Sequence, residues 1–178
     1  MSDETFSDQL GWRSFSDADR HREYSPSSCV GGEIQPFLTE YAEASATARS
    51  WAREQGFELR TLCYGASESQ TVDVVTPDGD LVPLVVFIHG GYWQQLSKLD
   101  SFAPAQDFLS RGVAYAAVDY TLAPSATVEE IIAECRRAVS MIREKADDLG
   151  IDPDRIVIAG SSAGGHLTAM VALDPTIS

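Results

Sequence analysis

Basic residues are scarce in this chain of 178 residues. It has 13 Lys and Arg against 27 Asp and Glu, which gives a formal net charge of −14. Binding to phosphate groups requires clustered Lys and Arg, so this balance disfavours nucleic acid and anionic membrane surfaces as partners. The acidic excess by itself indicates little more than a soluble surface.

Cysteine and long apolar runs are also sparse. Cys29, Cys63 and Cys135 are odd in number, widely spaced and outside any metal-ligand motif, which predicts reduced thiols in a cytoplasmic protein. The acidic N-terminus lacks the apolar segment of a signal peptide, and no run reaches transmembrane length. We therefore expect no membrane association, and no motif predicts a metal or other cofactor.

The most informative motif is the run Gly-Ser-Ser-Ala-Gly-Gly at residues 160–165, which directly follows an apolar run at 155–159. Small residues around a serine, between a strand and a helix, are typical of a nucleophile elbow, with Ser162 at its apex. The N-terminus of the following helix would then offer the Ala163 N–H to an oxyanion. Alone, such a cluster is often only a turn.

A second motif supports catalysis. The apolar run at 83–88 has the character of a buried parallel strand, and it ends in His89-Gly90-Gly91-Tyr92-Trp93. Oxyanion donors of nucleophile-elbow enzymes come from a loop of this kind, so the Gly90 and Gly91 N–H groups are candidate donors. The alternative is a Gly-Gly loop beside a structural histidine.

Together, the two motifs resemble the arylformamidase (kynurenine formamidase) branch of the α/β-hydrolase superfamily, whose hallmark is an HGGxW motif. The run Asp-Tyr-Thr-Leu-Ala-Pro at 119–124 and the N-terminal stretch from Tyr24 are similar to the same family. Tyr92 stands where related esterases usually have a third glycine, which favours the formamidase branch. Tyr92 and Tyr120 are candidate substrate-binding residues, and Trp93 is expected to be structural.

The resemblance implies hydrolysis of an ester or an aryl formamide, such as N-formyl-kynurenine, by a Ser-Asp-His triad with Ser162 as nucleophile. In this fold the acid and then the base follow the serine along the chain. His21, His89 and His166 do not have the position of the base, and Asp174 does not have that of the acid. We therefore expect a chain truncated relative to the family, with the nucleophile and oxyanion half of the site.

The order of predicted elements indicates an α/β fold. We expect an acidic, poorly ordered segment at 1–22, then at 23–178 the N-terminal part of a three-layer α/β-hydrolase domain. Its elements are a helix at 36–55, antiparallel strands at 57–64 and 70–76, and parallel strands at 83–88, 113–119 and 155–159. Helices are expected at 97–111, 127–149 and 163–173. The last strands of the fold are absent, which predicts association through an exposed sheet edge.

Three functions remain open from the sequence. The first is a serine hydrolase of the arylformamidase type, and the second is a general carboxylesterase on the same fold. The third is a catalytically inactive fragment, because a serine without its base is a poor nucleophile. In the first two cases the partner would be a small-molecule ester or formamide.

Overall fold

The computed structural model describes residues 11–175 and divides the chain into two compact units, with the boundary between Thr39 and Glu40. The first unit contains a short 3₁₀ helix η2 (Gly11–Ser14), helix α1 (Asp17–Tyr24) and a second 3₁₀ helix η3 (Pro26–Val30). The disorder expected for residues 1–22 stays a prediction, because residues 1–10 lie outside the described residues. The division expected at residue 23 likewise stays a prediction.

The second unit is built on one mixed sheet of five strands, in the order β1-β2-β4-β3-β5. Antiparallel pairing joins β1 to β2 and β2 to β4, whereas β3 is parallel to both of its neighbours. This is the predicted combination of antiparallel first strands with a parallel remainder. The strands are β1 (Leu59–Cys63), β2 (Thr71–Val75), β3 (Val82–Ile88), β4 (Ala114–Val118) and β5 (Ile151–Gly160).

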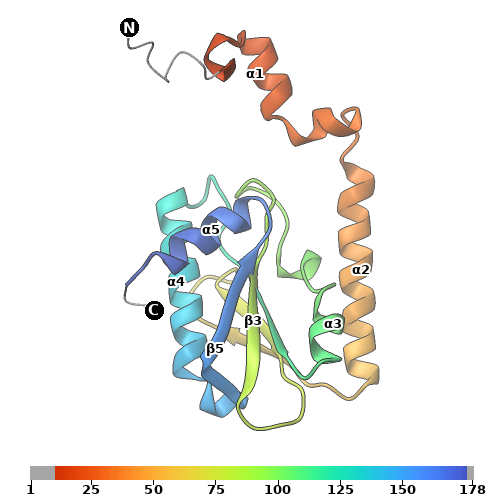
Figure 1. Cartoon of the computed structure of the whole chain (residues 1–178), viewed down its shortest axis with the longest axis vertical. Coiled ribbons are helices and arrows are strands. Elements are labelled where there is room, and N and C mark those ends of the chain that lie inside the picture. Colours follow the sequence, from red (N-terminus) through yellow and green to blue (C-terminus); the bar gives the residue numbers. More distant parts are fainter. Residues whose placement is uncertain (1–10, 176–178) are drawn as a thin grey trace, which may run out of the picture. The chain divides into compact units, whose positions relative to one another are not determined.

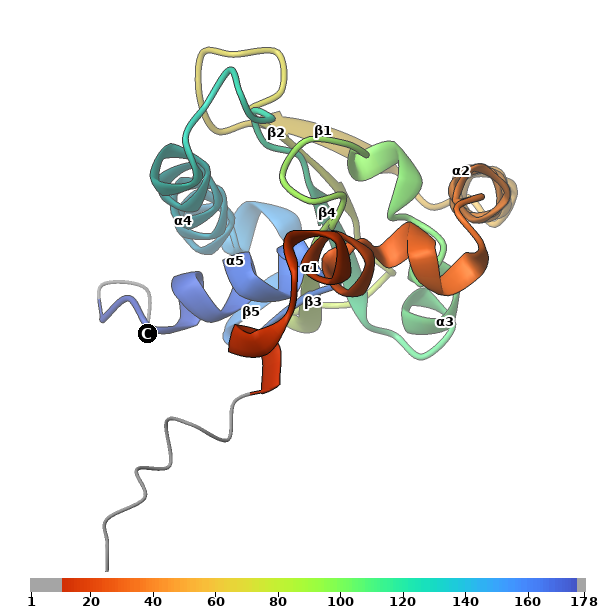
Figure 2. The same cartoon turned by 90° about the horizontal axis from the view of Figure 1, so that it is seen from above.

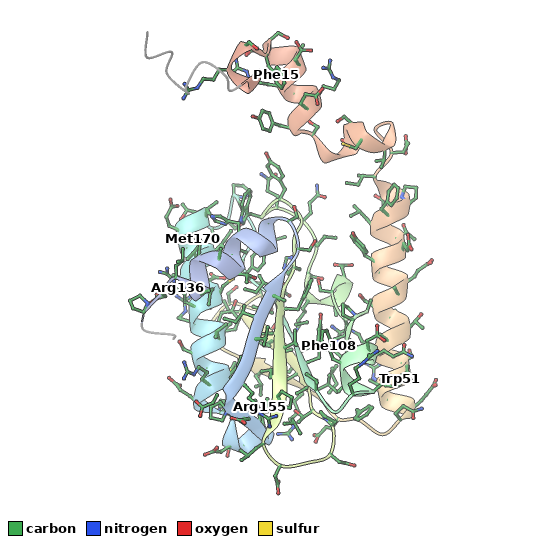
Figure 3. All side chains as sticks on the ribbon, viewed as in Figure 1. Phe15, Trp51, Phe108, Arg136, Arg155 and Met170 are labelled. Atoms are coloured by element: carbon green, nitrogen blue, oxygen red, sulfur yellow. The ribbon has the colours of Figure 1, made fainter. Side chains whose placement is uncertain are left out.

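Helices cover both faces of this sheet and complete the three layers of an α/β fold (Figures 1 and 2). Helices α4 (Val128–Glu144) and α5 (Ala163–Ala172) pack on one face. On the other face lie α3 (Ala105–Leu109) and the part of α2 (Gln35–Glu54) that belongs to this unit. Trp51 and Phe108 pack on this second face (Figure 3).

The core follows from the sequence pattern. All five residues of β4 are buried, as expected for a strand covered on both faces. Thr127 and Glu130 form a capping box at the start of α4, and the apolar stripe of that helix faces the sheet. Cys135 is buried in this stripe, and burial raises the pKa of its thiol to about 12.

The single helix predicted at 97–111 is wrong. The structure has a 3₁₀ turn, η4 (Lys98–Asp100), and then the separate α3. Pro104 disfavours helical geometry at the residue before it. The backbone between the two helices also bonds elsewhere, since Phe102 and Ala103 N–H groups donate to Ser45 Oγ and Tyr115 donates to Ser101 O. Tertiary hydrogen bonds thus replace the helical ones.

Strand β5 is longer than predicted. It begins at Ile151 rather than Arg155, so residues 152–154 belong to the strand. The pairing of β5 with β3 is irregular at this point. Val82 pairs with Ile151, whereas Leu84, two residues further on, pairs with Ile156. The extra residues of β5 are accommodated in a bulge beside Pro83, which has no N–H to donate to a ladder.

Strand β5 forms one edge of the sheet, because β3 is its only partner among residues 11–175. The side chain of Val157 at this edge is 59% exposed. A strand of such length, with apolar residues and one edge unpaired, is a template for pairing with another chain. Within the same residues, none of the helices combines the length and apolar character that a membrane span requires.

We predict that the purified chain associates through β5. Val157→Lys should shift the protein toward the monomer in size-exclusion chromatography with light scattering, because a charge on an edge strand opposes strand pairing. Leu99→Lys, at a residue that is 58% exposed and outside the sheet, serves as the control. A monomeric wild-type protein would contradict this prediction.

A buried ionic cluster ties α2, β2 and η4 together. The Asp73 carboxylate accepts hydrogen bonds from Arg49 at 2.7 Å, from Lys98 Nζ at 2.8 Å and from Thr61 at 2.7 Å. Arg49 also donates to Lys98 O. Burial raises the pKa of Asp73, but the hydrogen bonds from Lys98, Thr61 and Arg49 outweigh it and hold the pKa below its usual value.

We predict that Asp73→Asn lowers the free energy of unfolding by about 3 to 5 kcal/mol, because it leaves Arg49 and Lys98 without their buried partner. The folded-state pKa of Asp73 is depressed, so its contribution is present above about pH 4 and is lost as the pH falls further. In urea unfolding, the free energy of unfolding should fall less between pH 7 and pH 3 in Asp73→Asn than in the wild type. Asp107→Asn, in an exposed pair with Arg111, should change stability by less than about 0.5 kcal/mol.

Candidate active site

Three loops of the second unit leave the sheet at one edge. Strands β4, β3 and β5 are parallel, so their carboxyl ends lie side by side. The His89 loop follows β3, the segment that starts at Asp119 follows β4, and Ser161 follows β5. The topology therefore brings both sequence motifs to one place, with the Asp119 segment beside them.

Ser162 occupies the turn between β5 and α5. Its φ of 54° and ψ of −118° are unusual for a residue other than glycine, and its side chain is exposed and makes no capping hydrogen bond to the helix. Such backbone strain persists only where the surroundings impose it, and it is frequent at functional sites. Ser162 thus lies in a strained strand-to-helix turn, and its role as a nucleophile stays a prediction.

The loop at residues 89–93, called the oxyanion loop after its predicted role, packs directly against the turn at Ser162. A Cβ added at Gly90 would lie 2.7 Å from Ser161 O and 3.3 Å from Ser162 Cβ. A Cβ at Gly164, in the first turn of α5, would overlap Ile88 O. Glycine at both positions therefore permits the close approach of loop, strand and helix.

Several backbone N–H groups at this junction have no acceptor among residues 11–175. They include those of Gly90, Gly91 and Ala163, the three predicted oxyanion donors, and those of Tyr92, Trp93 and Ser162. The next two N–H groups of α5 are paired, since Gly164 and Gly165 donate to Ser161 O and Ser162 O. Because backbone donors in folded proteins are normally paired, free ones beside an exposed serine form a candidate oxyanion site.

His89 lies beneath the loop and is 1% exposed. Its Nδ1 is 2.8 Å from Gly90 O, which can only accept, so Nδ1 carries the proton of this hydrogen bond. Its Nε2 is 3.4 Å from Asp119 Oδ1. The imidazole is thus held within the loop by these contacts.

Tyr92 and Trp93 continue the loop with φ angles of 58° and 60°. The ring of Tyr92 is 57% exposed, consistent with a residue that could meet a ligand. Trp93 is half-buried, and its ring makes edge contacts with Tyr92 and with His166, at centroid distances of 5.6 and 5.4 Å. His166 is exposed on α5, one turn after Ser162.

Tyr120 does not face the surface. It is 1% exposed, its ring stacks on His89 at 4.1 Å, and its hydroxyl donates to His89 O and Gly90 O. This position does not support the predicted contact of Tyr120 with substrate. The residue lies under the oxyanion loop instead.

Two further residues near the site were not expected from the sequence. The buried Glu134 carboxylate accepts hydrogen bonds from Thr121 N–H and from Gln70, both at 2.8 Å. Tyr64 donates to Asp119 O at 2.6 Å. Both hold the segment after β4. The one signal in the sequence for a buried Glu134 was its place next to Cys135, on the apolar stripe of α4.

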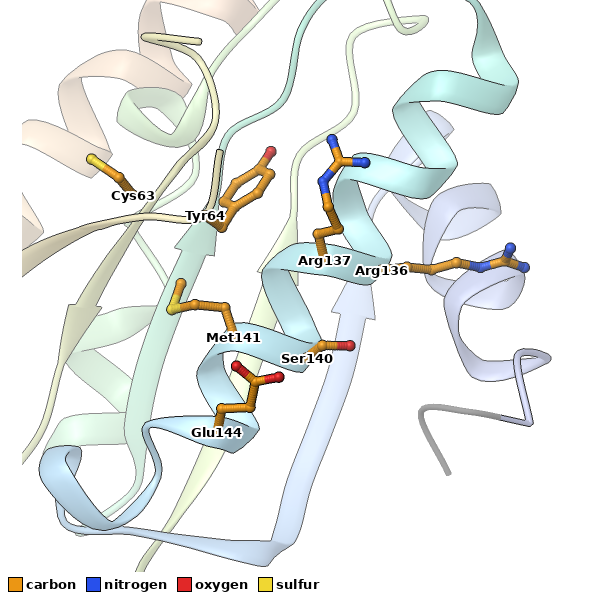
Figure 4. A pocket seen from close by; sticks show the side chains of 7 residues that line it. All are labelled: Cys63, Tyr64, Arg136, Arg137, Ser140, Met141 and Glu144. Atoms are coloured by element: carbon orange, nitrogen blue, oxygen red, sulfur yellow. The ribbon is translucent and has the colours of Figure 1, made fainter. Parts of the chain in front are cut away.

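A surface pocket of about 400 Å³ lies elsewhere, between the end of β1 and α4 (Figure 4). Tyr64, Arg137 and Met141 contribute to its lining, and none of the predicted site residues does. One wall includes Arg136, which is already engaged with Met170 O and Asp174. The pocket is thus separate from the elbow and the oxyanion loop.

Comparison with known proteins agrees with this geometry. The family model BD-FAE matches residues 72–177, which include the sheet from β2 onward and both motifs. The chain belongs to the BD-FAE family. Within the α/β-hydrolases it is arylformamidase-like, as predicted: kynurenine formamidase of Salmo salar is 32% identical over 168 residues. That match covers 90% of this chain and 54% of the relative.

Other relatives share the same part of the fold. Carboxylesterase NlhH of Mycobacterium tuberculosis is 37% identical over 123 residues, 67% of this chain and 38% of the relative. A solved structure from Silicibacter sp. TM1040 superposes with a TM-score of 0.73 at 32% identity, covering 86% of this chain and 55% of the other. The chain thus spans about half the length of the kynurenine formamidases it matches.

The close approach at Gly164 gives a testable consequence. Gly164→Ala should lower the free energy of unfolding by about 1 to 3 kcal/mol or more, because its Cβ would overlap Ile88 O. At Gly165, one residue on, an added Cβ would lie an ordinary 3.5 Å from Gly160 O. Gly165→Ala should therefore be neutral or stabilise by up to about 1 kcal/mol. Equal effects in urea unfolding would refute the contact.

Proposed function

We propose that this protein provides the nucleophile and oxyanion half of a serine hydrolase site for small esters or aryl formamides. The observation that carries the proposal is the exposed, strained Ser162 beside three unpaired N–H groups, those of Gly90, Gly91 and Ala163. Similarity to kynurenine formamidases and to a carboxylesterase supports the same reaction class. No cofactor is required.

In the proposed reaction Ser162 Oγ attacks the carbonyl carbon of the substrate and loses its proton to a base. The carbonyl oxygen takes the electron pair as an oxyanion, which the three N–H groups stabilise by hydrogen bonds. Collapse of this intermediate, with the proton passed from the base to the leaving group, expels the alcohol or amine and leaves an acyl serine. Water then hydrolyses the acyl serine and restores the Ser162 hydroxyl.

Two histidines lie near Ser162. The His89 ring is buried beneath the loop, and the exposed His166 ring contacts Trp93. We assign neither of them as the base. Without a base, an oxyanion site and binding retain only about 10³ to 10⁴-fold of catalysis over water. We therefore propose weak intrinsic activity for this chain.

Substrate preference within this class favours a formamide. Kynurenine formamidase similarity extends over 90% of the chain, against 67% for the carboxylesterase, and Tyr92 offers an exposed ring next to the proposed donors. The second candidate is a general carboxylesterase. It is favoured by the 37% identity of this chain to the carboxylesterase, against 32% to the kynurenine formamidase. Comparing N-formyl-kynurenine with short p-nitrophenyl esters as substrates separates the two.

Cytoplasmic location remains a prediction.

We predict that a fluorophosphonate probe modifies Ser162, with the adduct located by peptide mass spectrometry. Ser162→Ala should abolish the adduct. Ser161→Ala should retain it, because Ser161 contributes its carbonyl to the turn, where it accepts from Gly164 N–H. A wild-type chain that stays unmodified over long exposure would reject intrinsic reactivity and favour the inactive fragment.

A further inference from the structure

The hydroxyl of Tyr120 contacts two successive carbonyl groups of the oxyanion loop. Its oxygen is 3.0 Å from His89 O and 3.2 Å from Gly90 O. A carbonyl can only accept, so the phenolic proton is shared between the two. His89 Nδ1 adds a second donor to Gly90 O at 2.8 Å. Both carbonyls are therefore held on the core side of the loop.

These contacts fix the opposite side of the same peptide groups. The His89–Gly90 and Gly90–Gly91 peptide bonds are trans, so each C=O points away from the N–H of the residue that follows. With His89 O held by Tyr120, the Gly90 N–H points away from the buried ring. With Gly90 O held by Tyr120 and His89, the Gly91 N–H does the same.

Glycine makes such a restraint necessary. A peptide between two glycines rotates easily because no Cβ limits its φ and ψ. A flipped Gly90–Gly91 peptide would present a carbonyl, which repels an oxyanion, in place of a donor. The orientation must therefore come from groups outside the loop.

The surroundings make Tyr120 suitable for this task. Its ring is stacked on His89 with an interplanar angle of 7°, and the residues on either side are held by Tyr64 and Glu134. Burial raises the pKa of Tyr120, so its hydroxyl keeps the proton that it donates. The donor therefore has a fixed place beneath the loop.

We propose that Tyr120 is a positioning residue, whose hydroxyl orients the Gly90–Gly91 backbone so that its N–H groups face the substrate oxygen. This inference rests on the proposed function for the meaning of that orientation, but the orientation itself can be tested without turnover. It replaces the substrate contact expected of Tyr120 from the sequence.

The test is nuclear magnetic resonance on the whole chain, uniformly labelled with ¹³C and ¹⁵N. In Tyr120→Phe, the carbonyl ¹³C signals of His89 and Gly90 should shift, and relaxation dispersion should appear at the Gly90 and Gly91 amides as their peptides begin to flip. Tyr115→Phe is the matched control, because Tyr115 is equally buried and its hydroxyl donates to Ser101 O at 2.7 Å, away from the oxyanion loop. It should leave these signals unchanged.

Unchanged signals in a folded Tyr120→Phe protein would overturn the proposal, as would equal changes in both variants. Should Tyr120→Phe fail to fold, 4-aminophenylalanine at position 120 keeps a donor at the same ring position. Wild-type Gly90 and Gly91 signals in that variant support the assignment, and altered signals in a folded variant oppose it.

Probe labelling separates this inference from the proposed function. If Ser162 reacts in the wild type, Tyr120→Phe should slow labelling by roughly 10-fold, less than the 10² to 10³-fold reported for outright loss of one oxyanion donor. An undiminished rate would contradict the positioning role. If Ser162 does not react in any variant, intrinsic activity fails, while the spectra still decide whether Tyr120 orients the loop.

Discussion

The candidate site depends on the parallel pairing of β3 with both β4 and β5. This pairing aligns the carboxyl ends of three strands, so that loops distant in sequence start side by side. Each loop then supplies a different part: an exposed serine after β5, unpaired N–H groups after β3 and the supporting Tyr120 after β4. Slipping β5 by one residue against β3 would separate Ser162 from Gly90 and would also invert the faces of the strand.

Two kinds of restraint maintain the strained backbone at this edge. Close packing acts from one side, where Gly90 and Gly164 allow the loop, β3 and α5 to approach one another. Buried polar groups act from the other. Tyr120 and His89 hold the loop carbonyls, and Asp73 holds Lys98, a few residues beyond the loop. Left-handed φ angles at Tyr92, Trp93 and Ser162 are tolerated because both restraints are present.

Most of the fold could be predicted from the sequence because its signals are local. Apolar runs mark the strands, and the two glycine motifs mark the loops that follow β3 and β5. The errors arose where distant residues decide the local structure. The helix expected at 97–111 is divided by hydrogen bonds to Ser45 on α2 and Tyr115 on β4, two residues outside this segment. The burial of Tyr120 depends on His89, a residue of another loop.

The serine and the candidate N–H donors form one part of the site, which is separate from the base for a physical reason. All three candidate oxyanion donors and the serine come from the ends of β3 and β5, and the groups that support them come from β4, α4 and the hairpin of β1 and β2. None of these contacts requires an element outside the described residues. Electrostatic preorganisation of the donors can therefore exist in this chain independently of proton transfer, since preformed dipoles need no reorganisation when charge develops. On this view the base determines how fast Ser162 reacts. Tyr120 and the β3–β5 register determine whether the N–H donors are in place to stabilise an oxyanion.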